Sequence, residues 1–140
     1  MKMVKKRHNP SGEEYALLVH PNMSALSALQ HGFAAKGIRC VVARDLPTAL
    51  LALSQHYFSL VLVTSSISEE GDGWALGGVT RLLFPDAYIG VLAPETSVLT
   101  LQAAINNGLN RIYDSATPAD NLVAALLADR KNPSLAASVH

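Results

Sequence analysis

Five short apolar runs recur along this chain, and a longer segment with apolar residues at helical spacing follows each one. The runs are Tyr15–Val19, Arg39–Ala43, Leu60–Val63, Tyr88–Leu92 and Arg111–Tyr113. Several are apolar at nearly every position, which is typical of parallel strands buried on both faces. Strands that alternate with helices favour an open sheet with helices on both sides. The sequence therefore predicts a doubly wound, five-stranded parallel α/β sheet with five helices.

Residues that start and stop helices bound the segments between the strands. Asn22 suits the N-cap of the first helix, and Gly37 suits its C-terminal end. Within that helix, Leu26, Leu29 and Phe33 share one face and are predicted to point inward. The other helices are predicted from about Asp45 to His56 (with apolar Leu50, Leu51 and Leu53), over 74–83, around Leu101 and Ile105, and over 118–130 (with Leu122 and Leu126 inward).

Composition and charge narrow the class of protein. The 140 residues are 49% hydrophobic and 16% charged, which indicates one globular domain rather than a disordered chain. No apolar run reaches the roughly 20 residues of a membrane-spanning helix, and the polar N-terminus does not resemble a signal peptide. We therefore expect a cytoplasmic protein that does not act at a membrane. Cys40 is the only cysteine and lies in a predicted strand, so we expect a buried thiol without redox chemistry.

The zero formal charge hides an uneven distribution. Four of the eleven basic residues lie in 1–12, which we interpret as a basic flexible arm, and 131–140 is predicted to be a flexible tail. The domain between them, 13–130, holds six basic and eleven acidic residues, a net charge of −5. Nucleic-acid binding needs a clustered basic surface, so we expect no nucleic-acid partner.

Three segments carry a resemblance to a known family. They are Phe58–Val63, Gly71–Leu76 and Asn107–Tyr113. In this order and spacing the chain resembles the receiver domain of response regulators (CheY-like), over most of 15–128. The resemblance implies a flavodoxin-like fold with strand order 2-1-3-4-5 and a role in two-component signal transduction.

The residues that a working receiver uses for phosphorylation are missing. By position, the acidic pair after the first strand falls on His20 and Pro21, and the phosphoacceptor aspartate on Thr64, or on Ser65 if the register slips by one. The Thr/Ser after the fourth strand falls on Ala93 and the lysine after the fifth on Ser115, while the aromatic switch position falls on Ile112. Without carboxylates for Mg²⁺ or a cation for the phosphoryl charge, we predict a degenerate receiver with no cofactor, no metal and no Mg²⁺-dependent phosphorylation.

Two other groups of polar residues have a simple structural explanation as well as a functional one. His20 and Asp114 end strands on the same edge, and a hydrogen-bonded pair there is one interpretation, although a metal site needs three or more ligands. Glu69, Glu70 and Asp72 form an acidic cluster that is better explained as a solvated loop, with Asp72 forming the turn.

These observations favour a stand-alone receiver-like domain that binds proteins and is not an enzyme, because the last predicted helix ends about ten residues before the chain does. A homodimer is one such partnership. The resemblance to receiver domains implies which surface would form the dimer. It would include Leu99, Gln102, Asn106, Tyr113, Asp120 and Ala124. The alternative is a sensor of a small ligand or anion, in a strand-end pocket lined by His20, Thr64, Ser65 and Ser115.

Overall fold

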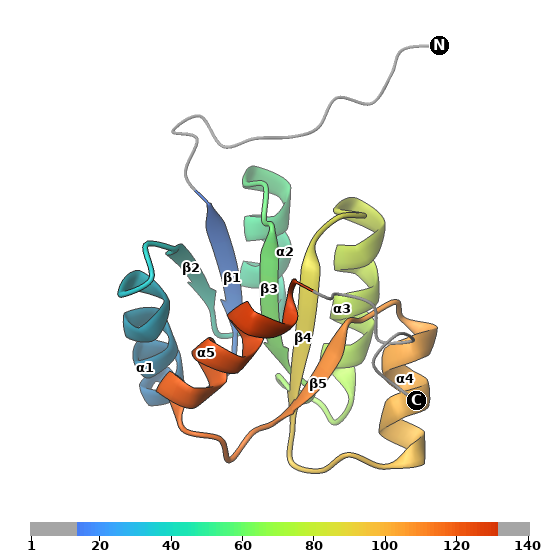
Figure 1. The fold of residues 1–140 in the computed structure, drawn as a ribbon. Coiled ribbons are helices and arrows are strands. Elements are labelled where there is room, and N and C mark those ends of the chain that lie inside the picture. Colours follow the sequence, from blue (N-terminus) through green and yellow to red (C-terminus); the bar gives the residue numbers. More distant parts are fainter. Residues whose placement is uncertain (1–13, 132–140) are drawn as a thin grey trace.

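The computed structural model describes residues 14–131 (Figure 1). The predicted arm at 1–12, and all of the predicted tail except Lys131, lie outside the described residues. Strands and helices alternate as the sequence predicted, and each boundary lies within a few residues of its expected place. The elements are β1 (Tyr15–Val19), α1 (Met23–Ala34), β2 (Arg39–Ala43), α2 (Leu46–Gln55), β3 (Leu60–Thr64), α3 (Asp72–Leu83), β4 (Tyr88–Ala93), α4 (Val98–Asn106), β5 (Arg111–Asp114) and α5 (Ala119–Asp129).

All strand pairings are parallel, and the strand order is β2-β1-β3-β4-β5. The chain therefore winds first toward β2 and then crosses back through β3 to β5. The predicted doubly wound fold and its order 2-1-3-4-5 are confirmed. In such a sheet the crossover point lies between β1 and β3, and ligands of this fold class bind at the carboxyl ends of the strands.

The two faces of the sheet build two cores. Alternate strand residues such as Val61 and Ile89 pack under α2, α3 and α4, whereas Leu62 and Leu92 pack under α1 and α5. Figure 1 shows α1 and α5 together on the near face of the sheet. Strands β1, β3 and β4 are covered on both faces, which explains why their sequences are apolar without alternation. Among the described helices none combines the length and the apolar character needed to cross a membrane.

The helix boundaries follow local chemistry. Asn22 Oδ1 accepts a hydrogen bond from the Ala25 amide at 2.9 Å, and Asp45 Oδ1 accepts one from the Thr48 amide at 2.8 Å. Each cap satisfies an amide that the first helical turn leaves without a partner. Gly37 follows α1 with φ +79°, a conformation that favours glycine.

On two helices the buried residues are not the largest apolar ones. Leu26, Leu29 and Phe33 of α1 are buried as predicted. On α2, however, Leu50 and Leu51 are exposed and two alanines are buried instead, and on α4 Ile105 is 57% exposed while Ala104 is buried. Both helices are apolar on several sides, so spacing alone could not tell which side faces the sheet.

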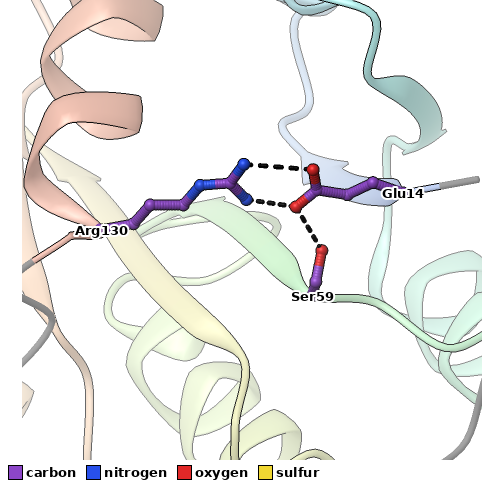
Figure 2. A network of polar contacts seen from close by, with 3 residues as sticks. All are labelled: Glu14, Ser59 and Arg130. Carbon is purple, nitrogen blue, oxygen red and sulfur yellow. Dashed lines mark hydrogen bonds and ion pairs between the residues drawn. The ribbon is translucent and has the colours of Figure 1, made fainter.

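A polar network closes the amino edge of the sheet (Figure 2). The Arg130 guanidinium, just after α5, forms a bidentate ion pair with Glu14, just before β1. Ser59 Oγ donates to Glu14 Oε2 at 2.7 Å from the start of β3. The hydrogen bonds from Arg130 lower the pKa of Glu14 despite its partial burial. The network ties the last helix to two central strands at the edge opposite the candidate site.

Candidate functional site

The carboxyl edge of the sheet is formed by the segments that follow β1, β3, β4 and β5. Register places Val19 beside Val63, Thr64 beside Leu92 and Ala93 beside Asp114. The strand ends are thus level with one another. The sequence-predicted positions therefore gather along one edge of the sheet.

His20 and Pro21, at the end of β1, are held by local bonds. His20 Nδ1 accepts a hydrogen bond from the Asn22 amide at 3.0 Å, and the Pro21 carbonyl accepts one from Arg44 Nε at 3.1 Å. A ring nitrogen that accepts from an amide carries no proton, so the neutral imidazole holds its proton on Nε2. Burial lowers the pKa of His20, which also favours this neutral form.

Thr64 and Ser65, at the end of β3, are enclosed by backbone. Their exposed fractions are only 9% and 7%. The Ser65 amide donates to the Leu92 carbonyl at 2.8 Å, and the Gly73 amide donates to the Ser65 carbonyl at 2.9 Å. A Cβ on Gly73 would lie 1.9 Å from the Thr64 carbonyl oxygen, so the start of α3 rests directly on the strand end. The β3–α3 loop therefore folds back over the predicted phosphoacceptor position.

The ends of β4 and β5 offer few polar side chains. Ala93 is buried and carries no donor or acceptor on its side chain. Ser115 is exposed, and its amide donates to the Ala93 carbonyl at 2.9 Å. Asp114 Oδ1 accepts from the Ala116 amide at 2.8 Å, which fixes a turn after β5. The edge is thus held mainly by backbone hydrogen bonds.

A small cavity opens between α1, α5 and the ends of β1 and β4. Its volume is about 150 Å³, and its lining includes His20 and Ser115 together with Leu29, Leu92 and Leu122. Of the four residues proposed to line a ligand pocket, Thr64 and Ser65 are not part of it. Pockets for small molecules usually measure about 300–1,000 Å³, so this cavity is small for such a site. None of its lining residues is a lysine or arginine, which disfavours an anion.

Solved response regulators share this architecture. A response regulator from Burkholderia pseudomallei, solved with a phosphorylated aspartic acid, calcium and citrate, matches 86% of this chain and 70% of its own, with TM-score 0.75 and 22% identity. A CheY-like receiver domain protein from Methanospirillum hungatei matches 86% and 96%, with TM-score 0.77 and 14% identity. This chain has the CheY-like receiver fold. An orphan response regulator of H. pylori matches 84% and 96%, with TM-score 0.73 and 16% identity. Neither the models of protein families nor the curated proteins give a match.

The edge of this receiver fold does not fit a magnesium ion. Mg²⁺ prefers octahedral oxygen ligands and is usually held by one or two carboxylates. His20, Pro21 and Thr64 supply none, and Asp114 is engaged in its own turn. Within residues 14–131 no group of three or more histidine, cysteine or acidic side chains is arranged to hold a metal. His20 and Asp114 each bond a local amide, which accounts for both side chains without a bond between them.

The acidic loop before α3 contains one structural carboxylate. Asp72 Oδ1 accepts from the Ile67 amide at 2.7 Å, and Oδ2 accepts from the amides of Ser68 and Glu69 at 3.0 and 2.9 Å. Desolvation opposes the charge, but these hydrogen bonds outweigh it and lower the pKa of Asp72 to about 2. The predicted role of Asp72 in the turn is confirmed.

We expect the Asp72→Asn variant to be about 1 kcal/mol less stable at neutral pH, because an amide offers one acceptor oxygen where the carboxylate offers two. The pKa of Asp72 is lower in the folded state than in the unfolded state. Its contribution is therefore present above about pH 4 and disappears as the pH falls toward about 2. Urea unfolding of both proteins across this range would measure the difference. Glu70→Gln in the same loop is the control, and an equal loss there would show a general charge effect.

The predicted switch position and its neighbour point to opposite faces of the sheet. Ile112, at the predicted aromatic position, packs half-buried under the α2–α4 face. Tyr113 points to the opposite face and is only 8% exposed. Its hydroxyl lies 2.8 Å from that of Tyr88 and donates to Asp129 Oδ2 at 3.0 Å, and Arg111 forms an ion pair with the same carboxylate at 3.3 Å. Burial and these partners raise the pKa of Tyr113.

One residue of the predicted interaction surface is placed differently. Tyr113 was expected on the surface but is buried, because its ring fills the core under α5. Asp120 is exposed but faces α1, with Oδ1 3.8 Å from the place of a Cβ on Gly32. The other four residues, Leu99, Gln102, Asn106 and Ala124, are exposed as that prediction requires.

Cys40 differs in part from its prediction. It lies on the edge strand β2 and is half-buried rather than fully buried. Desolvation raises the pKa of its thiol to about 11, so the thiol stays protonated at neutral pH. That protonation agrees with the expectation of an unreactive side chain.

Proposed function

We propose that this chain is a receiver-like signalling domain that works without aspartyl phosphorylation, by binding another protein in a two-component-type regulatory pathway. The fold that it shares with response regulators supports the signalling role. The observation that carries the proposal is the chemistry of the carboxyl edge. The positions of the acidic pair, the phosphoacceptor and the lysine hold His20, Pro21, Thr64 and Ser115.

The chemistry of phosphoryl transfer explains why this substitution pattern matters. A carboxylate nucleophile forms the acyl phosphate, a divalent ion bridges its oxygens, and a cation offsets a charge of about −1.5 to −2. Here a buried threonine replaces the carboxylate, and the start of α3 covers it. Ala93 lacks the hydroxyl, and Ile112 lacks the aromatic ring, through which phosphorylation would change the surface of the domain. Both the chemical step and its readout are therefore removed.

We propose that the domain is not an enzyme and that protein binding remains as its function. The serine and threonine hydroxyls at the strand ends have no histidine arranged as a base among the described residues, as nucleophilic catalysis requires. The alternative of a small-ligand sensor has less support, because the cavity at this edge is small and gathers only His20 and Ser115 of the four residues proposed for it.

The proposal predicts no response to phosphorylation chemistry. With Mg²⁺ and beryllofluoride, the melting temperature should stay within about 1 °C of its value in buffer, because a ligand that does not bind the folded state cannot stabilise it. Incubation with Mg²⁺ and acetyl phosphate should add no hydroxylamine-labile phosphate to the intact mass. A receiver that retains its acidic residues, treated in parallel, is the positive control. A labile phosphate on this chain, or Mg²⁺-dependent stabilisation, would overturn the proposal.

A further inference from the structure

The small cavity between α1 and α5 adjoins an open groove that lengthens it. The groove is lined by α1 and the start of α5, which Figure 1 shows together on one face of the sheet. It has a volume of about 500 Å³ and shares Ala28 and Ala119 with the cavity. The cavity alone is small for a ligand, but with the groove the space reaches the size usual for small-molecule sites. We define the cavity and the groove together as the α1–α5 site.

The inner part of the α1–α5 site is apolar and is kept open by small residues. Its walls are alanines of both helices, Ala25 and Ala28 of α1 and Ala119 of α5. Three buried leucines from three different elements complete the lining. They are Leu29, Leu92 and Leu122. The inner part therefore suits a short hydrocarbon chain.

Polar groups with unused hydrogen-bonding capacity also line the inner part. Because His20 Nδ1 accepts from the Asn22 amide, its Nε2–H is left as a donor. The hydroxyl groups of Ser115 and Thr117 line the same cavity, and neither makes a hydrogen bond within residues 14–131. A ligand that carries an acceptor at its inner end could satisfy these groups, whereas a pure hydrocarbon could not.

The outer groove carries one negative charge. Ser24, Ser27 and His31 of α1 line it on one side, and Asp120 of α5 lies on the other. Asp120 is exposed and forms no ion pair within residues 14–131. Neither the groove nor the cavity is lined by a lysine or an arginine. A carboxylate beside two serine hydroxyls offers acceptors to an ammonium group, which has three N–H donors.

The surrounding charge has the same sign. Among the described residues, the loops and first helical turns that follow the strands hold seven acidic residues and one basic residue. The acidic ones are Asp45, Glu69, Glu70, Asp72, Glu95, Asp114 and Asp120, and the basic one is Arg44. The whole chain has a formal net charge of zero, so this is a local property of the carboxyl edge. A local negative potential attracts small cations and repels anions.

We propose that the α1–α5 site binds a short aliphatic amine, with its ammonium group at Asp120 and a hydrogen-bond acceptor at its inner end near His20, Ser115 and Thr117. The apolar inner walls hold the chain between these two ends. This site differs from the strand-end pocket considered above, because it lacks Thr64 and Ser65 and extends along α1. The inference adds a ligand to the domain and does not depend on the proposed function.

Two probes of equal length test the recognition of charge. Aminopentanol carries an ammonium and a hydroxyl at opposite ends of a five-carbon chain, and pentanediol carries hydroxyls at both ends. In amide NMR titrations of the full chain, aminopentanol should shift signals of 24–31 and 115–122 with a dissociation constant in the millimolar range. Pentanediol should bind about threefold more weakly or less, which is the size of effect that an exposed ion pair gives. Raising NaCl from about 50 mM to about 500 mM should weaken only the amine.

Matched substitutions test the position of the site. Asp120→Asn removes the charge and keeps the shape, so it should weaken aminopentanol about threefold and leave pentanediol unchanged. Glu95→Gln removes an equal charge from the exposed loop after β4 and should have less than half of that effect. Ala28→Leu places a larger side chain where the cavity and the groove meet, and both probes should lose binding. Ala28 is exposed, so this change leaves the core intact, and thermal melts check that all three variants are folded.

Four results would overturn the inference. They are the absence of saturable shifts with aminopentanol, shifts centred away from α1 and α5, an equal affinity for pentanediol, and an equal effect of Glu95→Gln and Asp120→Asn. None of these measurements involves Mg²⁺ or beryllofluoride. Failure of the amine site would therefore leave the proposed function intact, whereas a beryllofluoride response would refute the proposed function by itself.

Discussion

Replacing Gly73 with alanine is expected to destabilise the fold by about 3 kcal/mol or more, and to lower the melting temperature by more than about 10 °C. The added Cβ would lie 1.9 Å from the carbonyl oxygen of Thr64 and 2.9 Å from the carbonyl carbon of Ser65. Both contacts are backbone atoms at the end of β3, where Thr64 pairs with Leu92 of β4 and the Ser65 amide donates to the Leu92 carbonyl. Neither can yield without disturbing β3 and the start of α3 together.

Gly71→Ala is the matched control for this substitution. Gly71 has φ +83°, and its nearest neighbour to an added Cβ is 3.9 Å away on Trp74. Alanine there has room but adopts a left-handed conformation, which costs about 1–2 kcal/mol. Urea unfolding should therefore rank the unaltered chain above Gly71→Ala and Gly71→Ala above Gly73→Ala, with low soluble yield as the extreme form of the last. If Gly73→Ala proves as stable as Gly71→Ala, the close packing of α3 on the strand end is wrong.

The fold could be predicted from the sequence because the residues that set its strands and helices act on their near neighbours in the chain. The apolar runs, the cap at Asn22, the helix start near Asp45 and the stop at Gly37 each depend on a few neighbouring residues, and all occur where expected. The carboxyl-edge positions followed from the strand ends, since Thr64 closes β3 and Asp114 closes β5. Those positions could be located without coordinates, although what they do remains a prediction.

The errors came from features that depend on distant parts of the chain. The burial of Tyr113 depends on Tyr88 and Asp129, which lie on other elements. The outward orientation of Ile105 depends on how closely α4 can approach the sheet, which the small residue Ala104 permits. Neither can be predicted from the spacing of apolar residues within a single helix or strand. One signal was present in the sequence, because an arginine within the apolar segment of 74–83 indicates a specific internal partner.

That arginine, Arg81, joins three segments at the amino edge of the sheet. Its Nε donates to the Gly108 carbonyl at 2.9 Å, and Nη1 donates to the carbonyls of Pro85 and Ala87 at 2.7 Å each. Nη2 donates to Asn110 Oδ1 at 2.7 Å. The guanidinium thus binds the end of α3, the turn into β4 and the turn into β5 at once. Burial lowers its pKa, but the side chain stays charged at neutral pH.

We expect Arg81→Met to cost about 3 kcal/mol or more, because methionine fills similar space but leaves several carbonyl groups without a donor. Arg81→Lys should cost less, since one ammonium reaches some of these carbonyls but cannot bind in the forked geometry. Arg44→Met is the control, because Arg44 makes a single exposed hydrogen bond to Pro21, and its loss should cost less than about 1 kcal/mol. Urea unfolding measures all three. Should Arg81→Met lose no more stability than Arg44→Met, then Arg81 does not hold these turns together.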